Sequence, residues 1–143
     1  MFMLGPCSST VSQRGLMPRI LLIDDDATMR NLLRMQLMAL QHSVEVAADA
    51  AEAIRSILEQ TPDLIISDLN MPYMNGLELL KAFRGDEITK CVPVILLTGS
   101  TSDENWMEAM ELGVTRYVIK PVQIDELVKE INLALKSSVQ KQR

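Results

Sequence analysis

The fold is decided by residues 20–30, which read ILLIDDDATMR. The first four residues are consecutive aliphatics, and such a run is typical of a strand that is covered on both faces of a parallel sheet. Three aspartates follow at once, and apolar residues at helical spacing begin at Met29. The string therefore predicts a buried strand that ends in acidic residues and leads into an amphipathic helix.

The same unit recurs along the chain. Other aliphatic runs occupy residues 64–66 and 92–97 (apart from Pro93), and weaker runs of the same kind occupy residues 44–47 and 117–119. Helical periods follow these runs, at residues 27–40, 50–58, 76–84, 103–112 and 124–135. Right-handed crossovers then place helices on both faces and require the strand order to reverse, which leaves a crevice beyond the carboxyl ends of the strands. We predict an α/β fold, (βα)5, with a doubly wound five-stranded parallel sheet and a ligand site in that crevice.

The composition is that of one globular domain. The chain has 143 residues, of which 48% are apolar and 23% charged, and its formal net charge is −5. A negative chain has no broad positive field for a phosphate backbone, so we expect no direct nucleic-acid binding. Cys7, Cys91 and His42 lack the spacing of a zinc site.

The domain limits follow from where the periodic pattern begins and ends. We expect residues 1–17 to form a disordered leader, residues 18–138 the folded domain and residues 139–143 a C-terminal tail. Met17 stands directly before the first strand, which leaves open whether residues 1–16 are natively translated. No apolar run is long enough for a membrane span or a signal peptide, so we expect no membrane insertion and a cytoplasmic location.

Acidic residues close two of the predicted strands. Asp24, Asp25 and Asp26 follow the first run, and Asp68 ends the run that begins at residue 64. The carboxyl ends of parallel strands meet at one edge, where several carboxylates repel one another unless a cation intervenes. Mg²⁺ prefers oxygen ligands and is the expected ion. The alternative is that these acids cap helices, and Asp26 fits the N-cap of the helix at residues 27–40.

Two other strand ends carry polar groups. Thr98 ends the fourth strand and Lys120 ends the fifth, directly before Pro121. A hydroxyl and an ammonium beside carboxylates are the groups that stabilise a phosphoryl group in transit. The combined pattern favours phosphoryl chemistry, although Thr98 by itself is explained by capping and Lys120 by itself by ordinary exposure.

Four strings in this order resemble the receiver domains of two-component response regulators: residues 20–30 (ILLIDDDATMR), 67–76 (SDLNMPYMNG), 94–98 (VILLT) and 117–121 (YVIKP). The resemblance covers about residues 19–137. It implies a flavodoxin-like strand order of 2-1-3-4-5, and a phosphorylated signalling switch that catalyses only its own phosphotransfer and dephosphorylation. We therefore expect a stand-alone receiver, similar to the chemotaxis regulator, and no true enzyme.

The resemblance also assigns roles by position. Asp68 would accept the phosphoryl group from a histidine kinase or a histidine phosphotransfer protein, forming an aspartyl phosphate. Mg²⁺ would be held by Asp25, by Asp68, by the backbone carbonyl of Asn70 and, through water, by Asp24. Thr98 and Lys120 would contact the phosphoryl oxygens.

The output is expected on the fourth helix (103–112), the fifth strand (117–119) and the fifth helix (124–135), where a downstream protein or a second copy would bind. Tyr117 matches the aromatic switch position of receivers, or else packs at a strand edge. Met107, Met110 and Val114 recur at helical spacing and are predicted to face the core. Trp106 would then turn to the flank, as a half-buried edge residue or as an interface anchor.

Two other functions compete with this one. Asp24, Asp26 and Thr28 fit the D-x-D-x-T motif of small Mg²⁺-dependent phosphatases of the haloacid dehalogenase class. That class needs a later acidic pair on a strand, and here Asp125 and Glu126 fall in a helical period. The third possibility is a receiver-like module that binds proteins without being phosphorylated.

Overall fold

The computed structural model describes residues 17–99 and 101–140. Five strands alternate with five helices: β1 (Arg19–Ile23), α2 (Ala27–Ala39), β2 (Ser43–Ala47), α3 (Ala50–Glu59), β3 (Leu64–Asp68), α4 (Gly76–Arg84), β4 (Val94–Thr98), α5 (Asp103–Glu111), β5 (Arg116–Ile119) and α6 (Ile124–Gln140). All paired strands are parallel, in the order β2-β1-β3-β4-β5. The predicted doubly wound α/β sheet and its strand order are confirmed.

The predicted domain limits, residues 18 and 138, remain a prediction, because most of the flanking residues lie outside the described part of the chain. The expected leader lies outside them except for Met17, and so do residues 141–143 of the expected tail. The last helix, α6, continues to Gln140, beyond the predicted helix end at residue 135.

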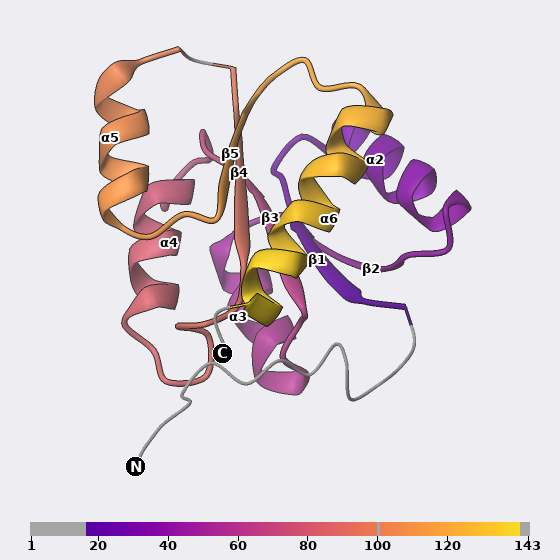
Figure 1. The fold of residues 1–143 in the computed structure, drawn as a ribbon, viewed down its shortest axis with the longest axis horizontal. Helices are drawn as coiled ribbons and strands as arrows, with labels where there is room; N and C mark the ends of the chain where they lie inside the picture. The colour runs from indigo at the N-terminus through magenta and orange to yellow at the C-terminus, as the bar shows by residue number, and fades with distance from the viewer. Residues whose placement is uncertain (1–16, 100, 141–143) are drawn as a thin grey trace.

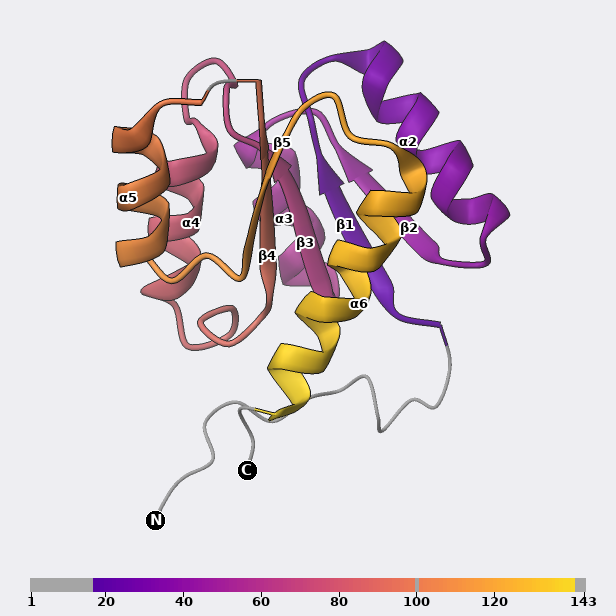
Figure 2. The same cartoon turned by 45° about the horizontal axis from the view of Figure 1, so that its top comes forward.

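The core consists of two apolar layers, one on each face of the sheet (Figures 1 and 2). Successive residues of a strand point to opposite faces, so Leu21 and Ile23 pack under α3, α4 and α5, whereas Ile20 and Leu22 pack under α2 and α6. Each fully buried aliphatic side chain contributes about 1.5–3 kcal/mol. The continuous aliphatic runs are therefore explained by burial on both faces, and the polar strand ends are left as the open edge.

Side-chain caps begin the helices at this edge. The Asp26 carboxylate accepts hydrogen bonds from the backbone N–H groups of Thr28 and Met29, at 3.0 and 3.3 Å. Asn75 and Glu78 form a reciprocal capping box at the start of α4. The expectation that Asp26 caps the first helix is confirmed.

The prediction for the core face of α5 is wrong in part. Met107 and Met110 are 56% and 43% exposed, and the fully buried residue of this helix is Ala109. Val114 does pack against the core, but it lies beyond the helix end at Glu111, so it does not extend the helical repeat. The three residues therefore do not share one helix face.

The turn after β3 brings the backbone back against the strand end. The Gly76 N–H donates to the Leu69 carbonyl at 2.8 Å. A Cβ atom at Gly76 would lie 2.7 Å from the Asp68 carbonyl oxygen and 2.9 Å from the Leu69 Cα. Only glycine allows this approach, because both neighbours are main-chain atoms that cannot rotate away.

We expect Gly76→Ala to lower the free energy of unfolding by about 1–3 kcal/mol, because the added methyl group forces the turn away from β3. Urea denaturation measures the change. The matched control is Gly85→Ala, where the new Cβ would meet nothing nearer than 3.6 Å. Equal stabilities of the two variants would contradict the close-approach argument.

Candidate functional site

Three carboxylates meet at the carboxyl ends of β1 and β3. These strands are neighbours, with Ile23 paired with Ser67, so Asp24 and Asp68 follow equivalent points of the sheet. One carboxylate oxygen from each of Asp24, Asp25 and Asp68 lies within 4.8 Å of the others. Asp24 and Asp68 are 1% and 7% exposed, whereas Asp25 is open to solvent. The structure thus brings together the carboxylates that the sequence places at two separate strand ends.

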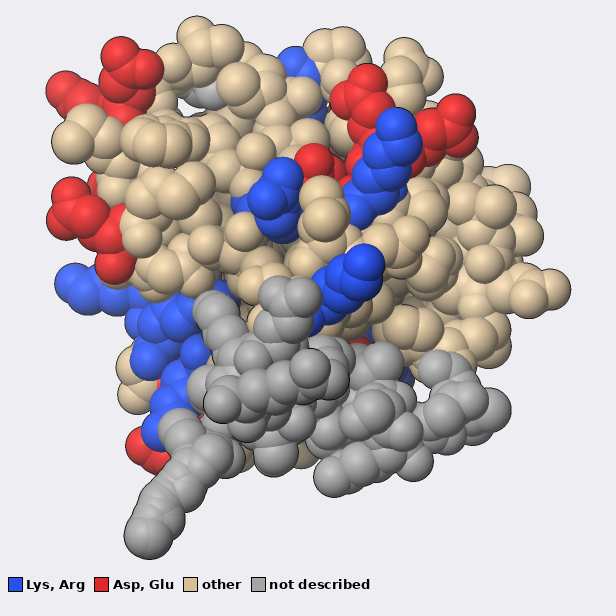
Figure 3. All heavy atoms as spheres, viewed as in Figure 1, with Lys and Arg blue, Asp and Glu red and all other residues tan. Residues whose placement is uncertain are grey.

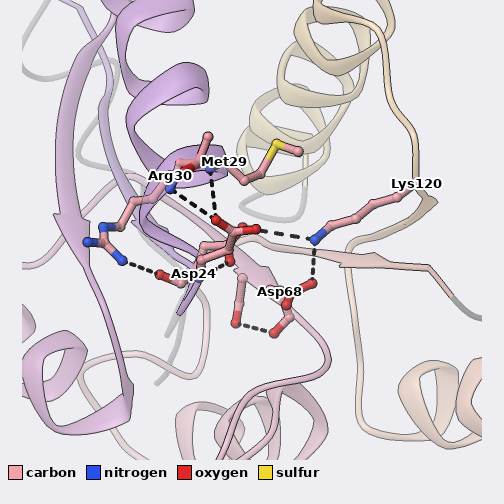
Figure 4. A network of polar contacts seen from close by, with 8 residues as sticks. Asp24, Met29, Arg30, Asp68 and Lys120 are labelled. Carbon is pink, nitrogen blue, oxygen red and sulfur yellow. Dashed lines mark hydrogen bonds and ion pairs between the residues drawn. The ribbon is translucent and has the colours of Figure 1, made fainter.

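Asp24 is the most constrained of the three (Figure 4). Its Oδ1 accepts the Asp26 N–H at 2.9 Å, and its backbone carbonyl accepts a hydrogen bond from the Arg30 guanidinium at 2.7 Å. Burial raises the pKa of Asp24, and repulsion by Asp68 and Asp25 raises it further, while the Asp26 N–H and Lys120 act in the opposite direction. The charged form of Asp24 is therefore less stable than that of an exposed aspartate.

Lys120 supplies the nearby positive charge. It follows β5, and its side chain reaches past β4, so that Nζ lies 2.8 Å from Asp68 Oδ1 and 3.9 Å from Asp24 Oδ2 (Figure 4). Its backbone N–H donates to the Thr98 carbonyl at 2.7 Å, and the Lys120–Pro121 peptide bond is cis. Lys120 thus joins the end of β5 to the carboxylates on β1 and β3.

The other expected site residues occupy different surroundings. Thr98 is fully buried at the end of β4, the strand between Asp68 and Lys120. Asn70 is exposed, two residues after Asp68. Tyr117 is partly buried in the layer under α3, α4 and α5, and Trp106 is 49% exposed on α5. The Tyr117 hydroxyl forms no hydrogen bond with any described residue, and so none with the carboxylates.

Two residues of the site were not predicted. Arg30 holds the backbone of Asp24 from the first turn of α2, and Gly76 holds the turn that follows Asp68. Both lie inside the strings quoted above, but their contacts are made to main-chain atoms, which residue type and spacing do not reveal. A glycine that closes a polar turn was the only available signal for Gly76.

The carboxylate group fits a hard metal ion. Asp24 Oδ2 is buried and has no hydrogen-bond partner among residues 17–99 and 101–140, and Lys120, 3.9 Å away, is the only cation there that forms an ion pair with it. Buried oxygen atoms without partners are unfavourable, and a cation with oxygen ligands removes the penalty. The cluster of Asp24, Asp25 and Asp68 is therefore able to bind a metal ion.

An apolar groove of about 510 Å³ opens beside the site, between α2 and residues 120–124. Met29 and Leu32 line its α2 side, and Pro121 and Val122 line the other. Lys120 lines the groove and also pairs with Asp68, so the groove adjoins the carboxylates. None of the helices in the described residues has the length and apolar character to cross a membrane.

Comparison with known proteins identifies the family. The model of the response regulator receiver domain matches residues 20–132. The transcriptional regulatory protein PrrA of Mycobacterium tuberculosis is 34% identical over 119 residues, which are 83% of this chain and 50% of PrrA. The virulence transcriptional regulatory protein PhoP of Salmonella typhimurium is 32% identical over 120 residues, 84% of this chain and 53% of PhoP. The chain thus spans about half the length of these curated relatives.

Solved structures agree with this match. The chemotaxis protein CheY4 of Vibrio cholerae superposes with a TM-score of 0.79 at 35% identity, covering 82% of this chain and 98% of CheY4. A CheY-like receiver domain protein of Methanospirillum hungatei gives a TM-score of 0.81 at 29% identity, covering 87% and 98%. The phosphatase alternative is set aside, because residues 20–132 match the receiver domain. The chain belongs to the response regulator receiver domain family, whose members are phosphoacceptor signalling modules of two-component systems.

Proposed function

We propose that Asp68 accepts a phosphoryl group from the phosphohistidine of a histidine kinase or of a histidine phosphotransfer protein. The observation that carries this proposal is the contact of Lys120 with only one Asp68 oxygen, Oδ1. No hydrogen bond or ion pair engages Oδ2 within residues 17–99 and 101–140. A carboxylate held by a cation on one side and open on the other is placed to act as a nucleophile.

In the proposed transfer, an oxygen of Asp68 forms a bond to phosphorus as the phosphorus–nitrogen bond of the donor breaks. The imidazole leaves with the electron pair of that bond and takes up a proton. Negative charge then spreads over the phosphoryl oxygens, where Lys120 and the Thr98 hydroxyl would stabilise it. The product is an aspartyl phosphate on Asp68.

We propose Mg²⁺ as the metal, held by Asp25, Asp68, the Asn70 carbonyl and, through water, Asp24. When bound, it neutralises the carboxylates and the incoming phosphoryl group. Its proposed ligands are oxygen atoms only, which suits Mg²⁺ better than softer metals.

The proposed donor docks on the apolar groove between α2 and residues 120–124. This groove adjoins Lys120, so a helix seated in it would carry a phosphohistidine toward Asp68. Burial of Met29, Leu32 and Val122 would supply the affinity, while the carboxylates and Lys120 remain available for the transfer.

The proposed output lies on α5, β5 and α6, where a downstream protein or a second copy would bind. Thr98 would move toward the phosphoryl group, and Tyr117 would adjust with it. The support is that Tyr117 packs in the same layer as Ala109 of α5, with its hydroxyl buried and without a hydrogen-bond partner in the described residues. A buried hydroxyl without a hydrogen-bond partner is unfavourable, so a second side-chain conformation of Tyr117 that pairs this hydroxyl would be stabilised.

We expect Asp68→Asn to abolish phosphorylation without unfolding the domain, since the change removes one charge from a repelling group. The chain is incubated with a small phosphodonor and Mg²⁺, and intact mass detects a single phosphoryl adduct that hydroxylamine removes. The matched control is Asp26→Asn, because asparagine caps a helix as well as aspartate. A full adduct in Asp68→Asn would refute the assignment, and no adduct in the parent chain would favour the phosphorylation-independent binding module.

We expect Asp25→Asn to raise the Mg²⁺ concentration needed for half-maximal adduct formation by at least about tenfold, because a ligand charge is lost. Titration of Mg²⁺ after treatment with a chelator measures this concentration. Asp26→Asn again serves as the control and should keep the parent value. An adduct that forms equally well with the chelator present would contradict the metal requirement.

A further inference from the structure

The three consecutive aspartates are held from both sides by one residue, Arg30. Its guanidinium donates to the backbone carbonyl of Asp24 at 2.7 Å (Figure 4), and its own backbone N–H donates to the carbonyl of Asp26 at 2.9 Å. The side chain of Arg30 makes the first of these contacts in a partly buried position. Arg30 therefore holds the chain immediately before and immediately after Asp25.

Two further backbone groups of this turn are also paired. The Asp24 N–H donates to the Ala47 carbonyl at 3.1 Å, and the Asp26 N–H donates to Asp24 Oδ1 at 2.9 Å. Asp25, between them, is exposed, and its carboxylate forms no hydrogen bond or ion pair within residues 17–99 and 101–140. The main chain is thus fixed on both sides of a carboxylate that is itself available to a ligand.

Arg30 makes its contact with the main chain in place of a stronger one. Three carboxylates lie at the same strand ends, and a guanidinium bonds a carboxylate more strongly than a neutral carbonyl. Arg30 nevertheless forms no ion pair in the described part of the chain, and the cation that pairs with the cluster is Lys120. Folding energy alone would favour the ion pair. The observed bond instead positions the main chain and leaves the carboxylate oxygen atoms to another cation.

We propose that Arg30 is a positioning residue that makes the cluster of Asp24, Asp25 and Asp68 selective for Mg²⁺ over the larger Ca²⁺. Mg²⁺ requires near-ideal octahedral geometry with oxygen atoms at about 2.1 Å, whereas Ca²⁺ accepts irregular shells of roughly six to eight oxygen atoms at about 2.4 Å. Ligands that are free to shift therefore reduce the affinity for Mg²⁺ more than the affinity for Ca²⁺. The inference rests on the proposed function, because it concerns the metal proposed for that site.

The charge of Arg30 by itself would act in the opposite direction. A positive guanidinium near the cluster repels a metal cation, so its removal would tighten the binding of Mg²⁺ and Ca²⁺ alike. Both signs of charge are spread over the face drawn in Figure 3, so the loss of one arginine changes the general field only slightly. Loss of the contact with Asp24 should instead weaken binding, and should weaken Mg²⁺ binding most. The sign of the change and the difference between the two ions therefore separate positioning from charge.

The test measures the affinities for Mg²⁺ and for Ca²⁺ by isothermal titration calorimetry on the full chain, after a chelator has removed bound metal. We expect Arg30→Gln to weaken Mg²⁺ binding about tenfold, as for other residues that orient metal ligands, and to weaken Ca²⁺ binding less. Arg34→Gln is the matched control, because it removes the same charge from the same helix, where the Arg34 guanidinium donates to the Met38 sulfur at 3.3 Å. This control should keep the parent ratio of the two affinities.

A second variant, Arg30→Lys, keeps the charge but lacks the planar donor fork of arginine. It should also lower the ratio of Mg²⁺ affinity to Ca²⁺ affinity, and it decides the test if Arg30→Gln does not fold. Tighter Mg²⁺ binding in Arg30→Gln would show that only the charge matters. Equal losses for the two ions would show a merely structural role. Either result, or unchanged affinities in both Arg30 variants, would overturn the inference.

Asp25→Asn separates failure of this inference from failure of the proposed metal site. If Asp25→Asn weakens Mg²⁺ binding and the Arg30 variants do not, the inference fails and the proposed site stands. If the parent chain binds no Mg²⁺, both fail. Intact mass reports the Asp68 adduct independently of the calorimetry, so phosphorylation of Asp68 is judged separately from the selectivity of the metal site.

Discussion

The ion pair between Lys120 and Asp68 is the interaction on which the site depends. Three carboxylates meet at one sheet edge, and two of them are buried, so that burial and the charges of Asp68 and Asp25 raise the pKa of Asp24. Lys120 partly offsets this repulsion from the far side of β4. The compensation is possible only because the strand order places β5 two positions from β3, within reach of a lysine side chain.

The backbone around these charges is held by contacts that leave the carboxylates themselves available. Arg30 binds the backbone carbonyl of Asp24 and not its carboxylate. The turn after Asp68 closes through Gly76, where a side chain would collide with the backbone of Asp68 and Leu69. Asp26 uses its carboxylate for the helix cap and so stays out of the cluster. The site therefore combines a fixed main chain with oxygen atoms that are not fully paired, which is the arrangement that a cation and a phosphoryl group require.

The sheet and the carboxylate cluster follow from local pattern, because continuous aliphatic runs specify buried strands and parallel strands end at a common edge. The contacts of Arg30 and Gly76 do not follow, since each depends on main-chain atoms brought near by the fold. The face of α5 was predicted wrongly for a related reason. Ala109 is the only fully buried residue of this helix, so the sequence has too few buried positions to show which face points to the core. Methionines at positions 107 and 110 are apolar, and their type alone predicts burial although both are exposed.

Among the described residues, the acidic cluster at the sheet edge and the acidic residues of α5 differ in how their charge is compensated. The cluster at the sheet edge is buried, and the chain supplies Lys120 to it. The glutamates of α5 are exposed, and no described residue of the chain supplies a cation to them. In water such charges are tolerated at small cost, but next to exposed Trp106, Met107 and Met110 they restrict what can cover the apolar surface. Any apolar surface that covered these side chains would also desolvate the neighbouring glutamates, which is unfavourable unless a positive charge compensates them.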